Sequence, residues 1–359
     1  MEAKFNYEKR WESIRTYLEK KECDAFVVKQ EGNVRYLSCA HIPFFPILTY
    51  VVIPRKGEPV ALTSSLEEFR AKEEAAVKEI KIFSPYPDIK NYEMNAQKAI
   101  EKLIKEKKFK KILCDSTLDG VKGAKPATDD FVNNMRMKKD NEELKCMREA
   151  AKLADYGAEC LEREIMRCGV SEMRMAAELD YILRTKGAQS MSFATIIASG
   201  SNSAYSHHDN TDRKIKEGDS VICDFGAYVN GYCSDMTRTF VLGGTEKWAE
   251  VYRAVLEAQK KAIGRAKKGA GFKDIDAAAR SHIRECGYAR NYVHSTGHGL
   301  GLDVHEAPTI SPIGKGKCEE SMVFTVEPGI YIPKKGGIRI EDDVLITDEG
   351  AECLTKAKK

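Results

Sequence analysis

Two aspartates flank a hairpin signal in the middle of the chain. Asp224 and Asp235 lie in apolar, β-branched runs on either side of Asn230-Gly231, the dipeptide that most strongly indicates a two-residue turn. This register places Asp235 opposite Gly226. Both aspartates then point to one face as diagonal neighbours, with backbones roughly 7–8 Å apart. Such carboxylates repel each other, so the pattern favours a metal ion between them over two solvent-facing aspartates on an edge hairpin.

Two histidines follow in a glycine-rich stretch. The segment reads Thr296-Gly-His-Gly-Leu-Gly-Leu-Asp-Val-His-Glu306, and it places His298 between two glycines. Glycine has no Cβ, so the backbone and a ligand can approach each other closely there. His305 follows seven residues later. This grouping favours a functional site over isolated structural histidines.

Two glutamates interrupt apolar runs near the end of the chain. Glu327 and Glu341 are symmetric about Lys334, so a turn of odd length would place them opposite each other. An unpaired buried carboxylate costs roughly several kcal/mol, so each glutamate needs a partner. Arg339 or nearby lysines could supply that partner, and so could a metal ion.

These residues together form a donor set of four carboxylates and one imidazole. Such a set suits two hard divalent ions, Mn(II), Co(II) or Fe(II), whereas a purely structural zinc site would more often use cysteine. Two ions about 3.5–4 Å apart share a water, lower its pKa and polarise a carbonyl or phosphoryl oxygen. The predicted ligands are Asp224, Asp235, His298, Glu327 and Glu341.

The chain resembles the pita-bread metallopeptidases, which include methionine aminopeptidase, Xaa-Pro aminopeptidase, Xaa-Pro dipeptidase (prolidase) and the metal-free creatinase. The resemblance covers residues 138–359 closely and the preceding part more loosely, through Asn33-Val-Arg-Tyr-Leu37. All five ligand positions of the family match, which implies two divalent ions: Mn(II) or Co(II), with Fe(II) or Zn(II) as further candidates. The motifs that carry it are Asp224-Phe-Gly, Asp235-Met-Thr-Arg, Gly297-His-Gly-Leu-Gly-Leu-Asp-Val-His-Glu306, Val326-Glu-Pro-Gly329 and Arg339-Ile-Glu341.

The resemblance also implies roles for side chains around the ions. The family has a histidine seventeen residues before the first metal-binding aspartate, and here that residue is His207. His207 and His305 would line the substrate pocket and stabilise the tetrahedral intermediate. Glu327 would be both a ligand and the proton shuttle, and Arg339 would orient a metal-bound carboxylate. His208 has no such role by analogy and is interpreted as a loop residue.

The N-terminal part narrows the choice among these relatives. Methionine aminopeptidases of this family generally lack a large N-terminal α/β domain, so residues 1–137 favour the proline-specific branch. The resemblance therefore implies hydrolysis of Xaa-Pro bonds, with an Xaa-Pro dipeptidase favoured. Some prolidases carry an arginine after the His-Glu motif, but residues 307–314 contain none, so an Xaa-Pro aminopeptidase for longer peptides stays open. A non-catalytic binding module is a third alternative, which the intact ligand set disfavours.

The composition restricts the partners and the cellular compartment that the sequence predicts. A net charge of +3 indicates neither nucleic acid nor an anionic membrane as a partner. No apolar run approaches the ~20 residues that cross a bilayer, and the charged first thirty residues do not read as a signal peptide. The eleven cysteines are scattered without a CxxC pair, which favours reduced thiols in a cytoplasmic protein. A homodimer is implied by the resemblance alone.

The 359 residues are expected to form two domains, 1–137 and 138–359. The first alternates helices with strands, which predicts an α/β domain with a mixed sheet. Its expected helices are 7–21, 66–79 and 96–106, and its expected strands are 25–28, 34–37, 50–53, 60–62, 80–83 and 111–114. Residues 115–141 are interpreted as the boundary.

The second domain is expected to be an α+β domain of pita-bread type, with helices flanking an antiparallel sheet. Asn141 is a candidate N-cap for its first long helix, and Ser171 caps a second helix that ends near Arg184. A strand over 193–198 leads into the aspartate hairpin. Helices follow at 246–268 and 274–286, and the last eighty residues are expected to be strands and turns.

Overall fold

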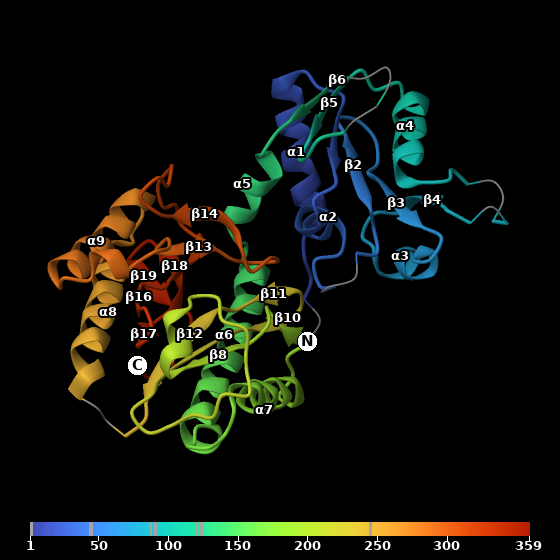
Figure 1. Ribbon diagram of the computed structural model, residues 1–359. Coiled ribbons are helices and arrows are strands. Elements are labelled where there is room, and N and C mark those ends of the chain that lie inside the picture. Colours follow the sequence, from blue (N-terminus) through green and yellow to red (C-terminus); the bar gives the residue numbers. More distant parts are fainter. Residues whose placement is uncertain are drawn as a thin grey trace. The chain divides into compact units, whose positions relative to one another are not determined.

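The structure is a computed structural model that describes residues 3–42, 46–86, 88–89, 92–118, 121, 125–243 and 246–359 (Figure 1). The chain divides into two compact units, Met1–Arg136 and Met137–Lys359. The first holds a mixed sheet with helices, and the second holds antiparallel sheets with helices. The predicted fold class is therefore confirmed. No helix in the described ranges is both long and apolar enough to cross a membrane.

The first unit is built on a six-stranded sheet in the order β4-β3-β2-β1-β5-β6. Strand β1 pairs antiparallel with β2 and parallel with β5, so the sheet is mixed as predicted. All four β1 residues are buried, as expected of a central strand covered on both faces. The strands are β1 (Ala25–Val28), β2 (Tyr50–Pro54), β3 (Val60–Ser64), β4 (Glu79–Phe83), β5 (Lys111–Cys114) and β6 (Lys125–Thr128); the helices are α1 (Tyr7–Lys21), α2 (Glu31–Ser38), α3 (Glu68–Glu74), α4 (Ala96–Glu106) and α5 (Phe131–Met137).

The strand predicted at residues 34–37 is wrong, because this stretch lies inside helix α2. Every residue of α2 from Gly32 to Ser38 is buried. A short helix that is buried all round shows no apolar stripe, and its sequence then looks like that of a buried strand. Its tertiary surroundings, rather than its periodicity, decide its conformation.

Three further boundaries differ from the expectation. The helix expected over 66–79 is shorter, because α3 ends at Glu74 and Glu79 already belongs to β4. The stretch 115–141 is not only a boundary, since it forms β6 and α5; residues 119–120 and 122–124 lie outside the described residues. Asp140, not Asn141, caps the first long helix of the second unit. Its carboxylate accepts a hydrogen bond from the Glu143 N–H, and Glu143 accepts one from the Asp140 N–H, a reciprocal capping box.

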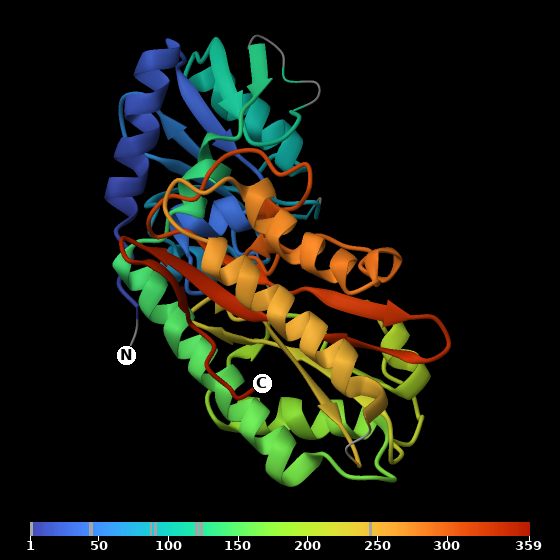
Figure 2. The same ribbon diagram turned by 90° about the vertical axis from the view of Figure 1, so that its left-hand side faces the viewer.

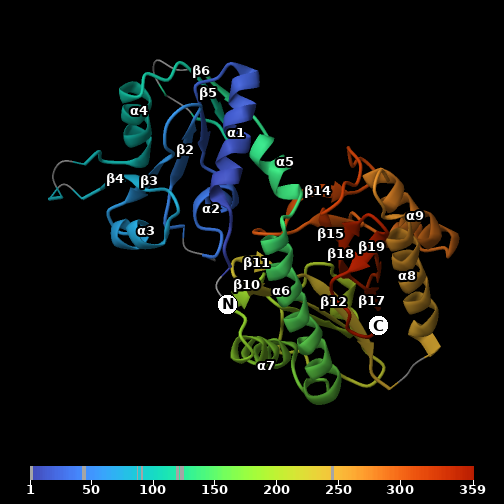
Figure 3. The ribbon, with the colours of Figure 1, turned by 180° about the vertical axis from the view of Figure 1, so that it is seen from behind.

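The second unit consists of antiparallel strands covered by four long helices. Helix α6 packs on β10 and β11, whereas α8 and α9 pack together over the C-terminal strands (Figures 1 and 2). Figure 3, seen from behind, shows α6 beside α7. The helices are α6 (Asn141–Cys160, continued by a π-turn at Leu161–Ile165), α7 (Glu172–Thr185), α8 (Glu246–Arg265) and α9 (Phe272–Glu285).

The strands of this unit form short sheets in the orders β11-β10-β7, β12-β9-β8, β14-β13-β15-β18-β19 and β16-β17. They are β7 (Ser190–Met191), β8 (Ile196–Ser199), β9 (Ser220–Phe225), β10 (Ala227–Val229), β11 (Tyr232–Cys233), β12 (Met236–Val241), β13 (Gly297–Gly299), β14 (Glu306–Ile310), β15 (Val323–Val326), β16 (Gly329–Ile332), β17 (Gly336–Arg339), β18 (Asp342–Thr347) and β19 (Gly350–Cys353). One apolar core lies between α8, α9 and β15–β18, and a second lies between α6, α7 and β9.

Candidate metal centre and active site

The aspartate hairpin has the predicted register. Tyr228 pairs with Cys233 near the turn, and Asp224 pairs with Thr237 farther along, which is the register that an Asn230-Gly231 loop requires. The ladder is interrupted between these two paired stretches, and Asp235 lies at the interruption. Gly226 is needed there, because a Cβ on it would lie 1.9 Å from the Ser234 carbonyl oxygen. Asp224 and Asp235 are both buried rather than solvent-facing.

The glutamates lie at a matching interruption in a second ribbon. Val326 pairs with Asp342, and Gly329 pairs with Arg339 in the same register, centred on Lys334. Glu327 and Glu341 fall in the gap between these two ladders, opposite each other as predicted. Lys334 adopts a φ of 64° in the turn that closes the ribbon. The backbone pairing is therefore interrupted at Asp235 in the first ribbon and at Glu327 and Glu341 in the second.

His298 comes from β13, which pairs beside β15 of the second ribbon. Gly297 allows this close packing, because a Cβ on it would lie 1.8 Å from the Thr325 carbonyl oxygen. The His298 Nε2 atom lies 3.4 Å from Glu327 Oε1 and 3.7 Å from Asp235 Oδ2. Ligand atoms of Asp235, His298 and Glu341 all lie within 4.8 Å of one another, a spacing that suits a metal ion.

The carboxylates of this cluster raise one another's pKa. Burial raises the pKa of Glu341 well above its usual range, and the charges of Asp235 and Glu327 add to the effect. Burial and the Asp224 charge likewise raise the pKa of Asp235. Burial raises the pKa of Glu327 to about 8, although the Arg339 charge opposes this. Negative charge is therefore costly here unless cations neutralise it.

A metal ion fits this donor set. Among the residues that the structure describes, none donates a hydrogen bond to Asp224 Oδ1, which is fully buried. A buried oxygen without a partner costs about 1–3 kcal/mol, and a coordinated cation would satisfy it. Burial also lowers the pKa of His298 to about 4, so its imidazole is neutral at pH 7, the form that binds metals. Oxygen-rich sets with one imidazole suit hard divalent ions.

Arg339 connects the cluster to its surroundings. Its guanidinium forms an ion pair with Asp224 Oδ2 and donates hydrogen bonds to the Thr237 and Tyr331 hydroxyl oxygens, at 3.1 and 2.8 Å. Thr237 in turn donates to Glu341 Oε2 at 2.6 Å. Arg339 is thus placed to orient the Asp224 carboxylate.

The two predicted pocket histidines lie close to the cluster. The His305 ring centroid is 4.2 Å from that of His298. Burial lowers the pKa of His305, and the charge of His207 lowers it further. His207 itself is exposed. The neighbouring His208 instead points to Glu172, at 2.8 Å.

Two residues near the cluster were not singled out from the sequence. His294 lies 4.0 Å from Glu327 Oε2, and its Nε2 atom lies 3.0 Å from the Tyr331 hydroxyl oxygen. Burial and the Arg339 charge lower the pKa of His294 to about 4. A signal was present, because His294 lies four residues before His298 and just ahead of the segment that holds the other two histidines. For Tyr331, the signal in the sequence was its position four residues after the predicted ligand Glu327.

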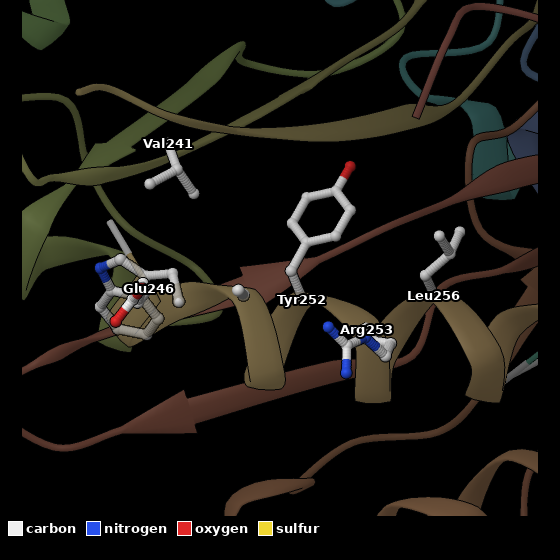
Figure 4. Close-up of a pocket in the computed structure, with 7 residues that line it drawn as sticks. Val241, Glu246, Tyr252, Arg253 and Leu256 are labelled. Carbon is white, nitrogen blue, oxygen red and sulfur yellow. The ribbon is translucent and has the colours of Figure 1, made fainter. Parts of the chain in front are cut away.

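The second unit also contains a cavity of about 600 Å³ without any of the predicted site residues (Figure 4). Val241 at the end of β12 lines it, together with six residues of α8: Glu246, Trp248, Ala249, Tyr252, Arg253 and Leu256. This lining is mainly apolar and offers no histidine or cysteine. The presence of a cavity therefore does not by itself identify the catalytic site of this protein.

Comparison with known proteins agrees with this geometry. Residues 145–348 match the profile described as "Metallopeptidase family M24", and residues 10–123 match "Creatinase/Prolidase N-terminal domain". The chain is 38% identical over 352 residues to the Xaa-Pro dipeptidase of Pyrococcus furiosus, covering 98% of each chain. The chain belongs to metallopeptidase family M24.

Solved structures of similar proteins cover both units. The prolidase of Pyrococcus horikoshii matches with a TM-score of 0.86 at 35% identity, over 98% of this chain and 99% of that chain. The X-Pro aminopeptidase of Thermotoga maritima matches with a TM-score of 0.85 at 32% identity, over 97% and 98%. The M24 match makes the chain a metallopeptidase, while both proline-specific activities occur among its structural neighbours.

Proposed function

We propose that the chain is an Xaa-Pro dipeptidase that uses two divalent metal ions. The observation that carries the proposal is the cluster of Asp235, His298 and Glu341, with Glu327 and Asp224 beside it, in a chain similar over 98% of its length to an Xaa-Pro dipeptidase. Mn(II) or Co(II) are the proposed ions, with Fe(II) or Zn(II) as alternatives. The residues that would hold them are Asp224, Asp235, His298, Glu327 and Glu341.

When bound, such ions lower the pKa of a shared water and polarise the scissile carbonyl. The other steps belong to the side chains. Glu327 would take a proton from the attacking water and pass it to the departing proline nitrogen. Arg339 holds the Asp224 carboxylate in place through its ion pair, so that the ligand does not rotate.

His207 and His305 are proposed to act on the substrate. Each imidazole can donate a hydrogen bond to the oxyanion that develops on the substrate carbonyl oxygen. The position of the His305 ring beside His298, with centroids 4.2 Å apart, supports this role. Together these rings would also form part of the pocket for the proline side chain.

An Xaa-Pro aminopeptidase is the second candidate. A dipeptidase needs a positive group for the free carboxylate of its substrate, and residues 307–314 contain no arginine to provide one. The similarity to the X-Pro aminopeptidase of Thermotoga maritima supports this alternative. Lys315 or Lys317 could bind the carboxylate if the enzyme is a dipeptidase.

Substrate length separates the two candidates. Release of proline from Gly-Pro and Leu-Pro should be compared with cleavage of Xaa-Pro-Xaa tripeptides, each with Mn(II), Co(II), Fe(II) and Zn(II). A dipeptidase cleaves the dipeptides and leaves the tripeptides intact, whereas an aminopeptidase cleaves the tripeptides. Failure of the metal-loaded protein on every Xaa-Pro peptide would contradict both.

The proposed setting is the cytoplasm, with a homodimer as the active form. All eleven cysteines are free and eight are buried, which supports a reducing compartment. In the first unit, Leu66 and Phe69 are 78% and 80% exposed, and such apolar surface supports burial against a second copy. Light scattering should then give twice the chain mass of 40.2 kDa.

A further inference from the structure

One carboxylate in the second unit gathers an unusual number of hydrogen bonds. Glu172 is fully buried at the first turn of α7. It accepts hydrogen bonds from the N–H and hydroxyl of Ser199, at 2.8 and 2.7 Å, and from those of Thr211, at 3.0 and 2.6 Å. The Asn202 amide donates at 3.1 Å, and His208 Nε2 lies at 2.8 Å. The Glu172 side chain therefore makes hydrogen bonds to both ends and to the interior of residues 199–211. This segment is named here the histidine loop.

The histidine loop carries His207, and both of its neighbours are held. On one side, the Ser206 carbonyl oxygen accepts a hydrogen bond from Arg339 Nη1 at 3.2 Å. On the other side, His208 is bonded to Glu172. The His207 side chain itself is exposed, and its Cα position is set by the backbone between these two anchored neighbours.

We propose that Glu172 is a positioning residue that, through His208 and the ends of the loop, holds His207 at the metal-ligand cluster before substrate arrives. This inference rests on the proposed function. Ordering a loop costs conformational entropy, and a catalytic group that is fixed in advance avoids that cost in each turnover. A displacement of 1 Å can cost about a hundredfold in rate.

Glu172 differs from Arg339 in one useful respect. Arg339 contacts both the loop and Asp224, so its removal disturbs the ligands as well. Among the described residues, none of the donors to Glu172 is a candidate metal ligand. Changes at Glu172 should therefore move His207 while both metal ions stay bound.

A double-mutant cycle tests this inference. Glu172→Gln, His207→Ala and the double variant are compared for Gly-Pro hydrolysis, with metal content measured in each. Glu172→Gln should lower kcat roughly tenfold to a hundredfold in the parent protein. In the His207→Ala background it should change kcat by less than about twofold, because the group that it positions is gone.

Glu143→Gln is the matched control. Glu143 is also a buried glutamate in the first turn of a helix, and it accepts a hydrogen bond from the Tyr232 hydroxyl at 2.9 Å. This variant should lower the melting temperature and leave kcat unchanged. The inference would be overturned if Glu172→Gln lowered kcat by the same factor in the parent protein and in the His207→Ala background. Loss of bound metal in Glu172→Gln would also overturn it.

One further measurement separates this inference from the proposed function. Imidazole NMR signals of the protein loaded with diamagnetic Zn(II) report the order of His207 without any substrate. The His207 signal should broaden or shift in Glu172→Gln, and an unchanged signal would overturn the positioning role even in an active enzyme. If Glu172→Gln does not fold, His208→Phe takes its place in the double-mutant cycle with His207→Ala. This variant removes a single donor to Glu172, and the same two results support or overturn the inference.

Discussion

Two groups of buried carboxylates in the second unit differ in what surrounds them. Glu172 accepts hydrogen bonds from Ser199 and Thr211, among others. Glu341 is buried to a similar degree, yet it accepts a hydrogen bond from Thr237 and faces the charges of three other carboxylates, which the Arg339 charge only partly offsets. The two environments shift the pKa in opposite directions. Burial alone would raise the pKa of Glu172, but its hydrogen bonds outweigh burial and lower it.

This contrast shows what separates a structural carboxylate from a metal ligand. Degree of burial does not distinguish Glu172 from Glu341. Hydrogen-bond satisfaction does, because a carboxylate surrounded by donors is stable as an anion without any ion nearby. The cluster that holds Asp235 and Glu341 has too few donors for its charge, so these two side chains are stable as anions only with cations bound.

The largest expected effect is on activity when a ligand of the cluster is neutralised. Asp224→Asn or Glu341→Gln should lose bound metal and lower peptidase activity by about a thousandfold or more, because the activated water depends on the ions. The fold should remain, as circular dichroism can verify. Asp180→Asn, which changes a carboxylate bonded to Thr195 outside the cluster, serves as the control. Full activity in either ligand variant would refute the two-metal assignment.

The pKa contrast predicts a pH-dependent stability of the metal-free protein. A carboxyl whose pKa is raised on folding stabilises the fold below its unfolded pKa, and this stabilisation is lost as pH rises through the folded pKa. For Glu327 the usual value is 4.5 and the folded value is about 8. Burial lowers the pKa values of His294 and His298 from 6.5 to about 4. Their contribution to the free energy of unfolding therefore increases as pH rises and is complete by pH 6.5.

Between pH 6.5 and 8, the carboxyls with raised pKa values therefore lower the stability of the fold, and the two histidines no longer offset this change. Metal-free protein should lose about 2 kcal/mol of unfolding free energy over this range from Glu327 alone. Metal-loaded protein should lose much less, since the ions favour the anions. Urea unfolding at both pH values, with EDTA or with Mn(II), measures the difference. A metal-free protein that is more stable at pH 8 would contradict the electrostatic account.

His207→Ala should have a smaller effect on activity than loss of a ligand. It removes one proposed donor to the oxyanion, which costs about a hundredfold in kcat. Both metal ions should stay bound, because His207 is not in the donor cluster. Metal analysis and steady-state kinetics test this together. Loss of metal in this variant would show that His207 has a different role.

Local rules were sufficient for the geometry of the two ribbons. The register at Asp224 followed from Asn230-Gly231, and the register at Glu327 and Glu341 followed from symmetry about Lys334; both are confirmed. In each case one turn determines every pairing along the ribbon, because paired residues of an antiparallel hairpin are equidistant from its turn. The capping box at Asp140 was also available from spacing alone, since Glu143 stands three residues later.

Other features depend on contacts between distant segments. Helix α2 is buried all round, so its sequence carries no helical stripe. Glu172 lies 39 residues from Thr211, and nothing in the intervening sequence indicates that they meet. Tyr331 and His294 meet through packing of different elements. The roles of the ligands and of the pocket histidines stay predictions until variants are measured.

The smallest expected effect tests whether the network around Arg339 matters beyond the ion pair with Asp224. Tyr331→Phe removes the hydroxyl that lies between Arg339 and His294, at 2.8 and 3.0 Å. Loss of one such hydrogen bond costs about 1 kcal/mol, so kcat/KM should fall about fivefold with metal content unchanged. Tyr232→Phe, which removes a buried hydroxyl bonded to Glu143, should leave kcat/KM unaltered. A loss of about a hundredfold in Tyr331→Phe would contradict a contribution on the scale of one hydrogen bond.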